Sequence, residues 1–175
     1  QLIHREKKTI MAHKLDVWLF TDCVGTLALV DGRLSFCFNP AWISRPDAVA
    51  LSTSLPLQPA PFDDRQTRPF FAGLLPEGQM RRLLARQFQV SGQNDFALLN
   101  RIGGECAGAV TFLEPGHPLP VSDHGNDVKW LSDEEVVAIL DELPRRPMLA
   151  GKDGLRLSLA GAQDKLPVVF DGTRI

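Results

Sequence analysis

Three short runs of apolar and β-branched residues lie close together near the start of the chain and are typical of β-strands. In the third run every second residue is apolar, so one face of that strand is expected to point into a core. Asp31 and Gly32 separate the second and third runs, and this pair favours a hairpin because its turn needs positive φ at both central positions. The pattern therefore predicts an antiparallel meander, with strands over residues 15–20, 26–30 and 33–38 and a first turn over 21–25.

Residues 49–57 alternate in the same way and predict a further strand, which a proline ends. Residues 58–68 are expected to form a loop, and residues 109–113 a last strand of this part of the chain. Together these elements predict a compact unit over residues 15–113. Its expected core is Val17, Leu19, Leu34, Phe36, Leu55, Leu83, Phe96, Leu99 and Val110.

Two segments between these strands have helical spacing. Residues 77–88 carry one apolar stripe, made by Met80, Leu83, Leu84 and Phe88. Residues 94–102 predict a second, shorter helix. The glycines that follow it, Gly103 and Gly104, stand where helices often end in a left-handed C-cap.

A connector rich in Pro, Gly and Asp follows, over residues 115–128. Ser132 and Glu135 then form the pattern of a capping box, which predicts the start of a helix. Its residues Val136, Val137, Leu140 and Leu143 are expected to face inward, and Pro144 to end it. Two more strands are predicted over residues 155–159 and 166–170, and a second Asp-Gly turn over residues 171–172 leads to a short end at Ile175.

These elements indicate an α+β fold with a small, barrel-like antiparallel sheet and packed helices. We expect residues 1–10 to be a tag or disordered extension, residues 11–114 the folded N-terminal subdomain and residues 115–131 a linker. Residues 132–175 are expected to hold a helix and the start of a strand–loop–strand unit. A return strand after residue 172 would be too short for an ordinary hairpin, since strands usually run to about five or six residues. We therefore expect the chain to be a piece of a longer protein.

Composition narrows the class of protein. The 175 residues are 44% hydrophobic and 23% charged, which is typical of a globular chain rather than a disordered one. The net charge of −2 gives no general attraction to nucleic acid or to an anionic membrane. No apolar run approaches the roughly 20 residues of a membrane-spanning helix. The unpaired spacing of Cys23, Cys37 and Cys106 indicates free thiols, and so a cytoplasmic protein.

Several features that suggest chemistry have simpler interpretations. The glycine-rich residues 103–108 follow a helix and precede a strand, which is the reverse of the order that a phosphate-binding loop needs. Residues 124–127 are expected to be plain linker. The four histidines lack the spacing of metal ligands, so no metal site is predicted. The arginines of the helix over 77–88 (Arg81, Arg82 and Arg86) form either a solvated face or a docking face for an acidic or phosphate-bearing partner.

One segment offers a real candidate site. Small residues separate the two strands predicted near the C-terminal end, and such residues leave backbone N–H groups open to phosphate oxygens. A strand–loop–strand over the phosphates is how the glycine loops of kinases bind ATP. The candidate ATP-binding residues are Ala160, Gly161, Ala162, Gln163, Asp164 and Lys165.

Four sequence motifs, in the order in which they follow one another along the chain, resemble those of the HipA-type serine/threonine kinases of bacterial toxin–antitoxin modules. Residues 51–57 are similar to the family's Leu-Ser-x-Ser-Leu-Pro-Leu segment, and residues 70–78 to its Phe-Phe-x-x-Leu-Leu-Pro-Asp/Glu segment. Residues 108–110 match its Gly-Ala-Val. Residues 158–165 match its Ser-x-Ala-Gly-Ala-Gln-Asp/Glu-Lys loop, so the resemblance covers nearly all of residues 15–170.

The resemblance implies a role for each part of this loop. In that family the loop that matches Ala160 to Lys165 covers the phosphates of ATP, with Mg²⁺ as the metal, and the serine that matches Ser158 is an autophosphorylation site. Characterised members phosphorylate aminoacyl-tRNA synthetases. Many are held by a helix-turn-helix antitoxin of the HipB type, which binds operator DNA, so contact with DNA would be indirect.

The family's catalytic residues lie downstream of Ile175. No catalytic residue is therefore predicted here, and the chain alone is expected to be inactive and to bind ATP weakly. Two functions remain open. The chain is either the N-terminal region of a HipA-type kinase or a free-standing, antitoxin-like module that binds a kinase.

Overall fold

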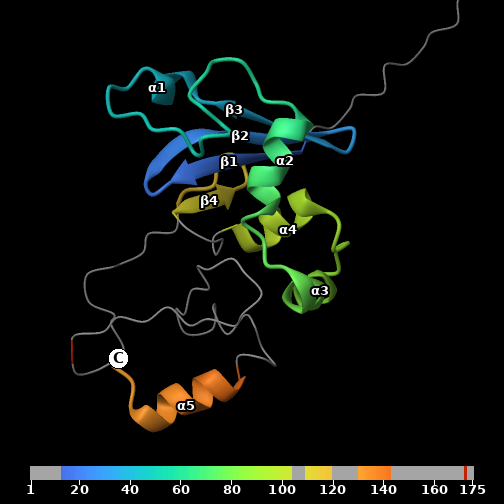
Figure 1. Cartoon of the computed structure of the whole chain (residues 1–175), viewed down its shortest axis with the longest axis vertical. Helices are drawn as coiled ribbons and strands as arrows, with labels where there is room; N and C mark the ends of the chain where they lie inside the picture. Colours follow the sequence, from blue (N-terminus) through green and yellow to red (C-terminus); the bar gives the residue numbers. More distant parts are fainter. Residues whose placement is uncertain (1–12, 104–108, 120–129, 143–171, 173–175) are drawn as a thin grey trace, which may run out of the picture.

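The computed structural model of the chain describes residues 13–103, 109–119, 130–142 and 172. Its centre is an open, four-stranded antiparallel sheet in the order β3-β2-β1-β4, which confirms the predicted α+β class. Figure 1 shows α2 and α4 beside this sheet, and α3 next to α4. The elements are β1 (His13–Leu19), β2 (Asp22–Val30), β3 (Arg33–Phe38), α1 (Pro40–Ile43), α2 (Asp64–Ala72), α3 (Gly78–Gln87), α4 (Asp95–Ile102), β4 (Val110–Leu113) and α5 (Asp133–Glu142).

The first three strands form the predicted meander, but the first turn is tighter than predicted. The chain reverses at Phe20 and Thr21, and β2 already begins at Asp22. Phe20 has a φ of 53°, a left-handed conformation that lets two residues make the reversal. The register then shifts, because Val17 pairs with Gly25 whereas Trp18 pairs with Cys23. The segment predicted as a turn is therefore strand with a bulge.

The second hairpin is confirmed. Asp31 and Gly32 have φ values of 49° and 76°, both positive, as a type I′ turn requires. The strands on each side pair in register from Val30 and Arg33 to Gly25 and Phe38. An Asp-Gly pair thus sets the alternation that puts the apolar residues of β3 on one face of the sheet.

Residues 49–57 do not form the predicted strand. They form turns and bends, with one isolated bridge between Ser52 and Leu55. Leu55 is nevertheless fully buried, as expected, because the loop folds it back into the core. The neighbour of β3 at the sheet edge is instead Phe62, whose N–H donates to the carbonyl of Phe36 at 2.8 Å.

Helix α2 begins inside the segment predicted as a loop, residues 58–68. Asp63 is its N-cap and accepts from the N–H of Gln66, while the Gln66 side chain accepts from the N–H of Asp63. This reciprocal pair is a capping box, and it satisfies two backbone donors that a helix start would otherwise leave unpaired. The helices predicted over 77–88 and 94–102 are confirmed as α3 and α4.

The C-cap of α4 differs from the prediction. Gly103 has a φ of −60°, so it does not take the left-handed conformation. Its lack of a side chain serves close packing instead, because a Cβ there would lie 2.6 Å from both the Cβ and the carbonyl oxygen of Phe112. Glycine at this position lets the end of α4 touch β4. Gly104 lies outside the described residues.

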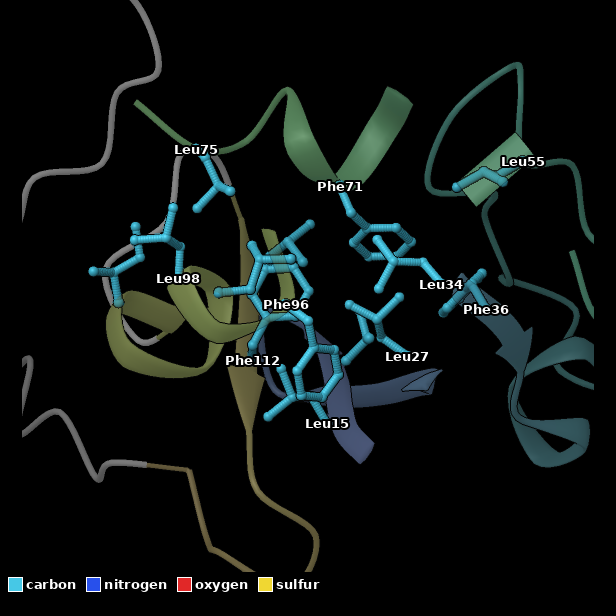
Figure 2. Close-up of a cluster of buried hydrophobic side chains, with 14 of the residues drawn as sticks. Leu15, Leu27, Leu34, Phe36, Leu55, Phe71, Leu75, Phe96, Leu98 and Phe112 are labelled. Carbon is cyan, nitrogen blue, oxygen red and sulfur yellow. The ribbon is translucent and has the colours of Figure 1, made fainter. Parts of the chain in front are cut away.

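The core lies between the sheet and the helices. Figure 2 shows Phe71 of α2 pointing toward Leu34 and Leu27 of the sheet, with Phe96 and Phe112 beside them. Leu34, Phe36 and Phe38, the predicted inner face of β3, are all fully buried. Seven of the nine predicted core residues are buried; Leu19 and Leu83 are half-buried, and Leu84 fills the place expected of Leu83.

Helix α5 begins with the predicted capping box. Glu135 donates its backbone N–H to the Ser132 hydroxyl at 3.3 Å, and its carboxylate accepts from the N–H of Ser132 at 2.9 Å. The expectation that its apolar residues face inward is wrong for the described part of this helix. Val137 is 56% exposed and Leu140 is 50% exposed, and none of the residues of α5 is buried. Leu143 and Pro144 lie outside the described residues.

Candidate functional site

The candidate phosphate loop lies outside the described residues. This holds for Ala160, Gly161, Ala162, Gln163, Asp164 and Lys165, for Ser158, and for residues 124–127 and Cys106. These residues stay predictions from the sequence. What the structure describes is the domain that precedes the loop, with one buried charge cluster and one surface hollow.

The charge cluster is centred on the carboxylate of Asp95 at the start of α4. The side chain of Asp95 is only 9% exposed, and each of its two oxygens faces a different arginine. Arg68 of α2 donates Nη1 to Oδ2 at 2.8 Å, and Arg81 of α3 pairs with Oδ1. Because a buried carboxylate is costly unless it is paired, these two contacts make Asp95 compatible with the interior.

Arg68 extends the cluster to the β2–β3 hairpin. Its Nη2 donates to Asp64 Oδ1 at 2.6 Å and to the carbonyl of Gly32 at 3.0 Å. The same oxygen of Asp64 accepts the N–H of Leu34 at 2.6 Å. The charged groups thus join the β2–β3 hairpin to α2 and α4.

The structure separates the three arginines of α3. Arg82 and Arg86 are exposed, as a solvated face requires. Arg81 is not part of that face, because it is half-buried and also donates Nε to the carbonyl of Gly92 at 2.6 Å. The sequence pattern could not reveal this, since the partner carboxylate, Asp95, lies 14 residues further along the chain.

The cluster makes a testable contribution to acid stability. Hydrogen bonds from Arg68 hold the pKa of Asp64 below its ordinary value, and the N–H of Leu34 adds to this, while burial acts in the opposite direction. A lowered pKa in the folded state gives stability that is complete above the unfolded pKa and is lost as the pH falls through the folded pKa. We expect the gap in unfolding free energy between the native chain and Asp64→Asn to shrink below about pH 4, the ordinary range of an aspartate.

Urea unfolding at a series of pH values measures this gap. Asp63→Asn is not a suitable control, because Asp63 caps α2. Asp31→Asn is suitable, since asparagine tolerates the positive φ of the turn. A gap for Asp64→Asn that stays constant from neutral to strongly acidic pH would contradict the assignment.

A hollow of about 420 Å³ lies on the opposite face of the sheet from the buried residues of β1 to β3. Two cross-strand rows of side chains form its floor, since β-strand residues alternate between the faces. Lys14, Ala28 and Ser35 make one row, and Asp16, Thr26 and Cys37 make the other. Pro115, just after β4, completes the lining.

The chemistry of the hollow is that of a shallow binding surface. Its lining mixes polar side chains with the apolar residues Ala28 and Pro115, and β1 contributes one charge of each sign, Lys14 and Asp16. On the same face, Trp18 Nε1 is buried without a hydrogen-bond partner among the described residues. Cys23 and Cys37 are free thiols, and burial, with help from the charge of Asp16, raises the pKa of the Cys23 thiol. A raised pKa makes Cys23 a poor nucleophile.

Within the described part of the chain, no three His, Cys, Asp or Glu side chains come together in a way that could hold a metal ion. None of the helices found there is both long enough and apolar enough to cross a membrane.

Comparisons with known proteins identify the domain. A family model described as the HipA N-terminal domain matches residues 15–113. In a solved complex of HipA, HipB and operator DNA from Shewanella oneidensis, the matching chain has a TM-score of 0.65 and 28% sequence identity. The match covers 91% of the present chain and 36% of that chain.

The two kinase-named relatives described here are longer than this chain. A Sinorhizobium fredii protein named "Putative kinase Y4mE" is 45% identical over 161 residues, which cover 89% of this chain and 38% of that protein. The serine/threonine-protein kinase toxin HipA of Shewanella oneidensis is 33% identical over 125 residues. The match covers 69% of this chain and 28% of that protein. An uncharacterised Haemophilus influenzae protein is 29% identical over 98 residues, covering 56% of this chain but 89% of that protein. The chain therefore belongs to the HipA N-terminal domain family and spans 38% of the length of the relative named "Putative kinase Y4mE".

Proposed function

We propose that this chain is the N-terminal region of a HipA-type serine/threonine protein kinase. The observation that supports this most strongly is that its similarity to kinase-named relatives runs over 161 residues, well beyond the 15–113 domain. In this proposal residues 13–113 form a rigid support. The segment after it brings the loop over residues 160–165 to the nucleotide.

The loop would bind ATP through its backbone. Ala160, Gly161 and Ala162 carry no bulky side chain, so their N–H groups can approach phosphate oxygens, and Lys165 adds a positive charge. ATP supplies the transferred phosphoryl group, and Mg²⁺ neutralises charge that builds up on it. The groups that hold the metal and activate the hydroxyl of the substrate would come from the part of the kinase beyond this chain.

Nucleotide binding gives the first test of this role. We expect calorimetric titration of the full-length kinase with ATP and Mg²⁺ to show binding that Lys165→Ala weakens about tenfold or more, a loss of at least about 1.4 kcal/mol. Arg174→Ala is the matched control, because it removes a positive charge outside the loop. The 175-residue chain should bind weakly or not at all. If Lys165→Ala and Arg174→Ala bind ATP with equal affinity, or if the 175-residue chain binds ATP tightly, the assignment of the loop is refuted.

The proposed partners follow from the same family. The related structure contains HipA with HipB and operator DNA, which supports a HipB-like antitoxin as a partner of the present protein. We propose that contact with DNA is indirect, through that antitoxin, and that the protein acts in the cytoplasm on an aminoacyl-tRNA synthetase. A gel-shift assay with labelled operator DNA tests this. We expect the antitoxin together with this protein to shift the DNA, and this protein alone to leave it unshifted.

A second function deserves its own test because of one relative. The Haemophilus influenzae protein is matched over 89% of its length by only 98 residues, so a protein little longer than this domain exists. The domain would then act as a separate antitoxin-like subunit that binds a kinase. Stable association of the 175-residue chain with a separately expressed kinase lobe, and inhibition of that kinase, would favour this alternative over the first proposal.

A further inference from the structure

Helix α3 carries two exposed arginines that take no part in the packing of the domain. Arg82 and Arg86 lie on the same side of the helix, because residues four positions apart are neighbours on a helix surface. The helix itself is firmly attached, since Leu84 is buried in the core and Arg81 pairs with Asp95. Figure 1 shows α3 farther from the sheet than α2 and α4. The two arginines therefore stand on a fixed support at the edge of the domain.

The charge of this pair is not balanced by the described residues around it. Within that part of the chain, neither Arg82 nor Arg86 has an ion-pair partner, whereas Arg45, Arg68 and Arg81 each contact an aspartate. Helix α3 itself contains no acidic residue. Two like charges at this spacing destabilise a helix slightly. The pair thus costs stability instead of adding to it.

The region around α3 is positive although the chain is negative overall. Residues 78–101 contain four arginines and one aspartate, a net charge of +3, whereas the whole chain has a net charge of −2. Gln79 is exposed on the same side as Arg82, one turn before it, and offers a neutral amide as a further hydrogen-bond donor. We call Gln79, Arg82 and Arg86 the arginine stripe. A positive surface of this kind attracts negatively charged partners.

We propose that the arginine stripe docks an acidic helical segment of a protein partner. Cβ atoms four positions apart on a helix are about 5–6 Å apart, so two carboxylates at this spacing match Arg82 and Arg86. Each guanidinium can donate two parallel hydrogen bonds to one carboxylate. Nucleic acid is a poorer match, because its binding relies on many phosphate contacts and the stripe offers two arginines. The inference does not depend on the phosphate loop or on kinase activity.

Fluorescence anisotropy with labelled synthetic peptides and the 175-residue chain tests the docking. The probe is an alanine-rich helical peptide of about 20 residues, long enough to be helical in water, with glutamates in pairs four positions apart. The matched peptide has glutamine at the same positions. We expect saturable binding of the glutamate peptide and no measurable binding of the glutamine peptide. Raising the salt from about 0.01 M to about 1 M should weaken the binding, because it shortens the reach of charges from about 30 Å to about 3 Å.

Variants of the chain assign the binding to the stripe. Replacing both arginines, Arg82→Ala with Arg86→Ala, should weaken binding of the glutamate peptide about tenfold or more, because charge-assisted hydrogen bonds are lost. Arg65→Ala is the matched control, since Arg65 is an exposed arginine of α2, and should change the affinity less than about twofold. Alanine is the best helix former, so the variants keep their helices, which circular dichroism verifies.

Three results would overturn the proposal. The first is a lack of binding of the glutamate peptide at low salt. The second is an equal loss of affinity in Arg65→Ala and in the chain without Arg82 and Arg86, which would show a general attraction of charge and no docking site. The third is tighter binding of a random-sequence DNA duplex than of the glutamate peptide, with the same dependence on Arg82 and Arg86, which would assign the stripe to nucleic acid.

Discussion

Replacing Phe36 with alanine should lower the free energy of unfolding by about 3–5 kcal/mol, the usual cost of removing a fully buried phenylalanine ring. Phe36 is 0% exposed and stands at the centre of an aromatic group. Its ring centroid lies 4.8 Å from that of Phe38, 5.2 Å from that of Phe71 and 6.2 Å from that of Phe62. The ring therefore joins β3, α2 and the segment that pairs with the sheet edge, and no neighbour can fill its place without moving.

Chemical denaturation followed by circular dichroism measures this loss. Phe20→Ala is the matched control, since Phe20 is 73% exposed at the tip of the first hairpin. Its replacement removes the same ring, keeps the same positive φ and should change stability by no more than about 0.5 kcal/mol. Similar losses in the two variants would show that the inner face of β3 has been assigned incorrectly.

Asp95→Ala should destabilise the domain by about 3 kcal/mol, at the lower end of the cost of breaking a buried ion pair. The substitution leaves Arg68 and Arg81 without their shared carboxylate, and it weakens the contacts of α4 with α2 and α3. We place the effect at the lower end because the arginine side chains are 34% and 22% exposed, so that water can partly replace the lost partner.

Asp47→Ala provides the control for this experiment. Asp47 also pairs with an arginine, Arg45, but its side chain is 63% exposed, and exposed ion pairs contribute little to stability because water screens them. Thermal or urea unfolding of both variants gives the comparison. If Asp95→Ala costs no more than Asp47→Ala, the cluster around Asp95 does not hold the helices as the structure indicates.

Local signals in the sequence predicted much of the fold. Asp31 and Gly32 specify a turn by themselves, and the alternation of Leu34, Phe36 and Phe38 specifies which face of β3 is buried. Ser132 and Glu135 likewise specify the start of α5. In each case the residues that determine the structure lie within a few positions of one another, so that tertiary contacts do not override them.

The predictions of secondary structure are wrong where tertiary contacts, and not the local sequence, determine the conformation. Residues 49–57 alternate like a strand but find no neighbouring strand, and only Leu55 enters the core. Helix α2 was missed because prolines and aspartates dominate the start of its segment, although the capping box of Asp63 and Gln66 was a local signal that could have revealed it.

The charge cluster could be predicted only in part. Arg81 looks like Arg82 and Arg86 in the sequence, and only the fold brings it to Asp95. The hollow on the outer face could not be found from spacing within one strand, because its floor needs the register of three strands. The charge cluster and the hollow are found only from the structure, whereas the loop from Ser158 to Lys165 is assigned only from sequence motifs, because it lies outside the described residues.

Phosphorylation of Ser158 tests most directly the claim that this chain belongs to a HipA-type kinase. A phosphoserine carries about −1.5 to −2 charges and would compete with the phosphates of ATP for the same backbone donors, so the modification would act as a switch. After incubation with ATP and Mg²⁺, mass spectrometry should find one phosphate on Ser158 in the full-length protein and none in Ser158→Ala or in the 175-residue chain. A full-length protein that carries phosphate elsewhere, with Ser158 unmodified, would contradict the account.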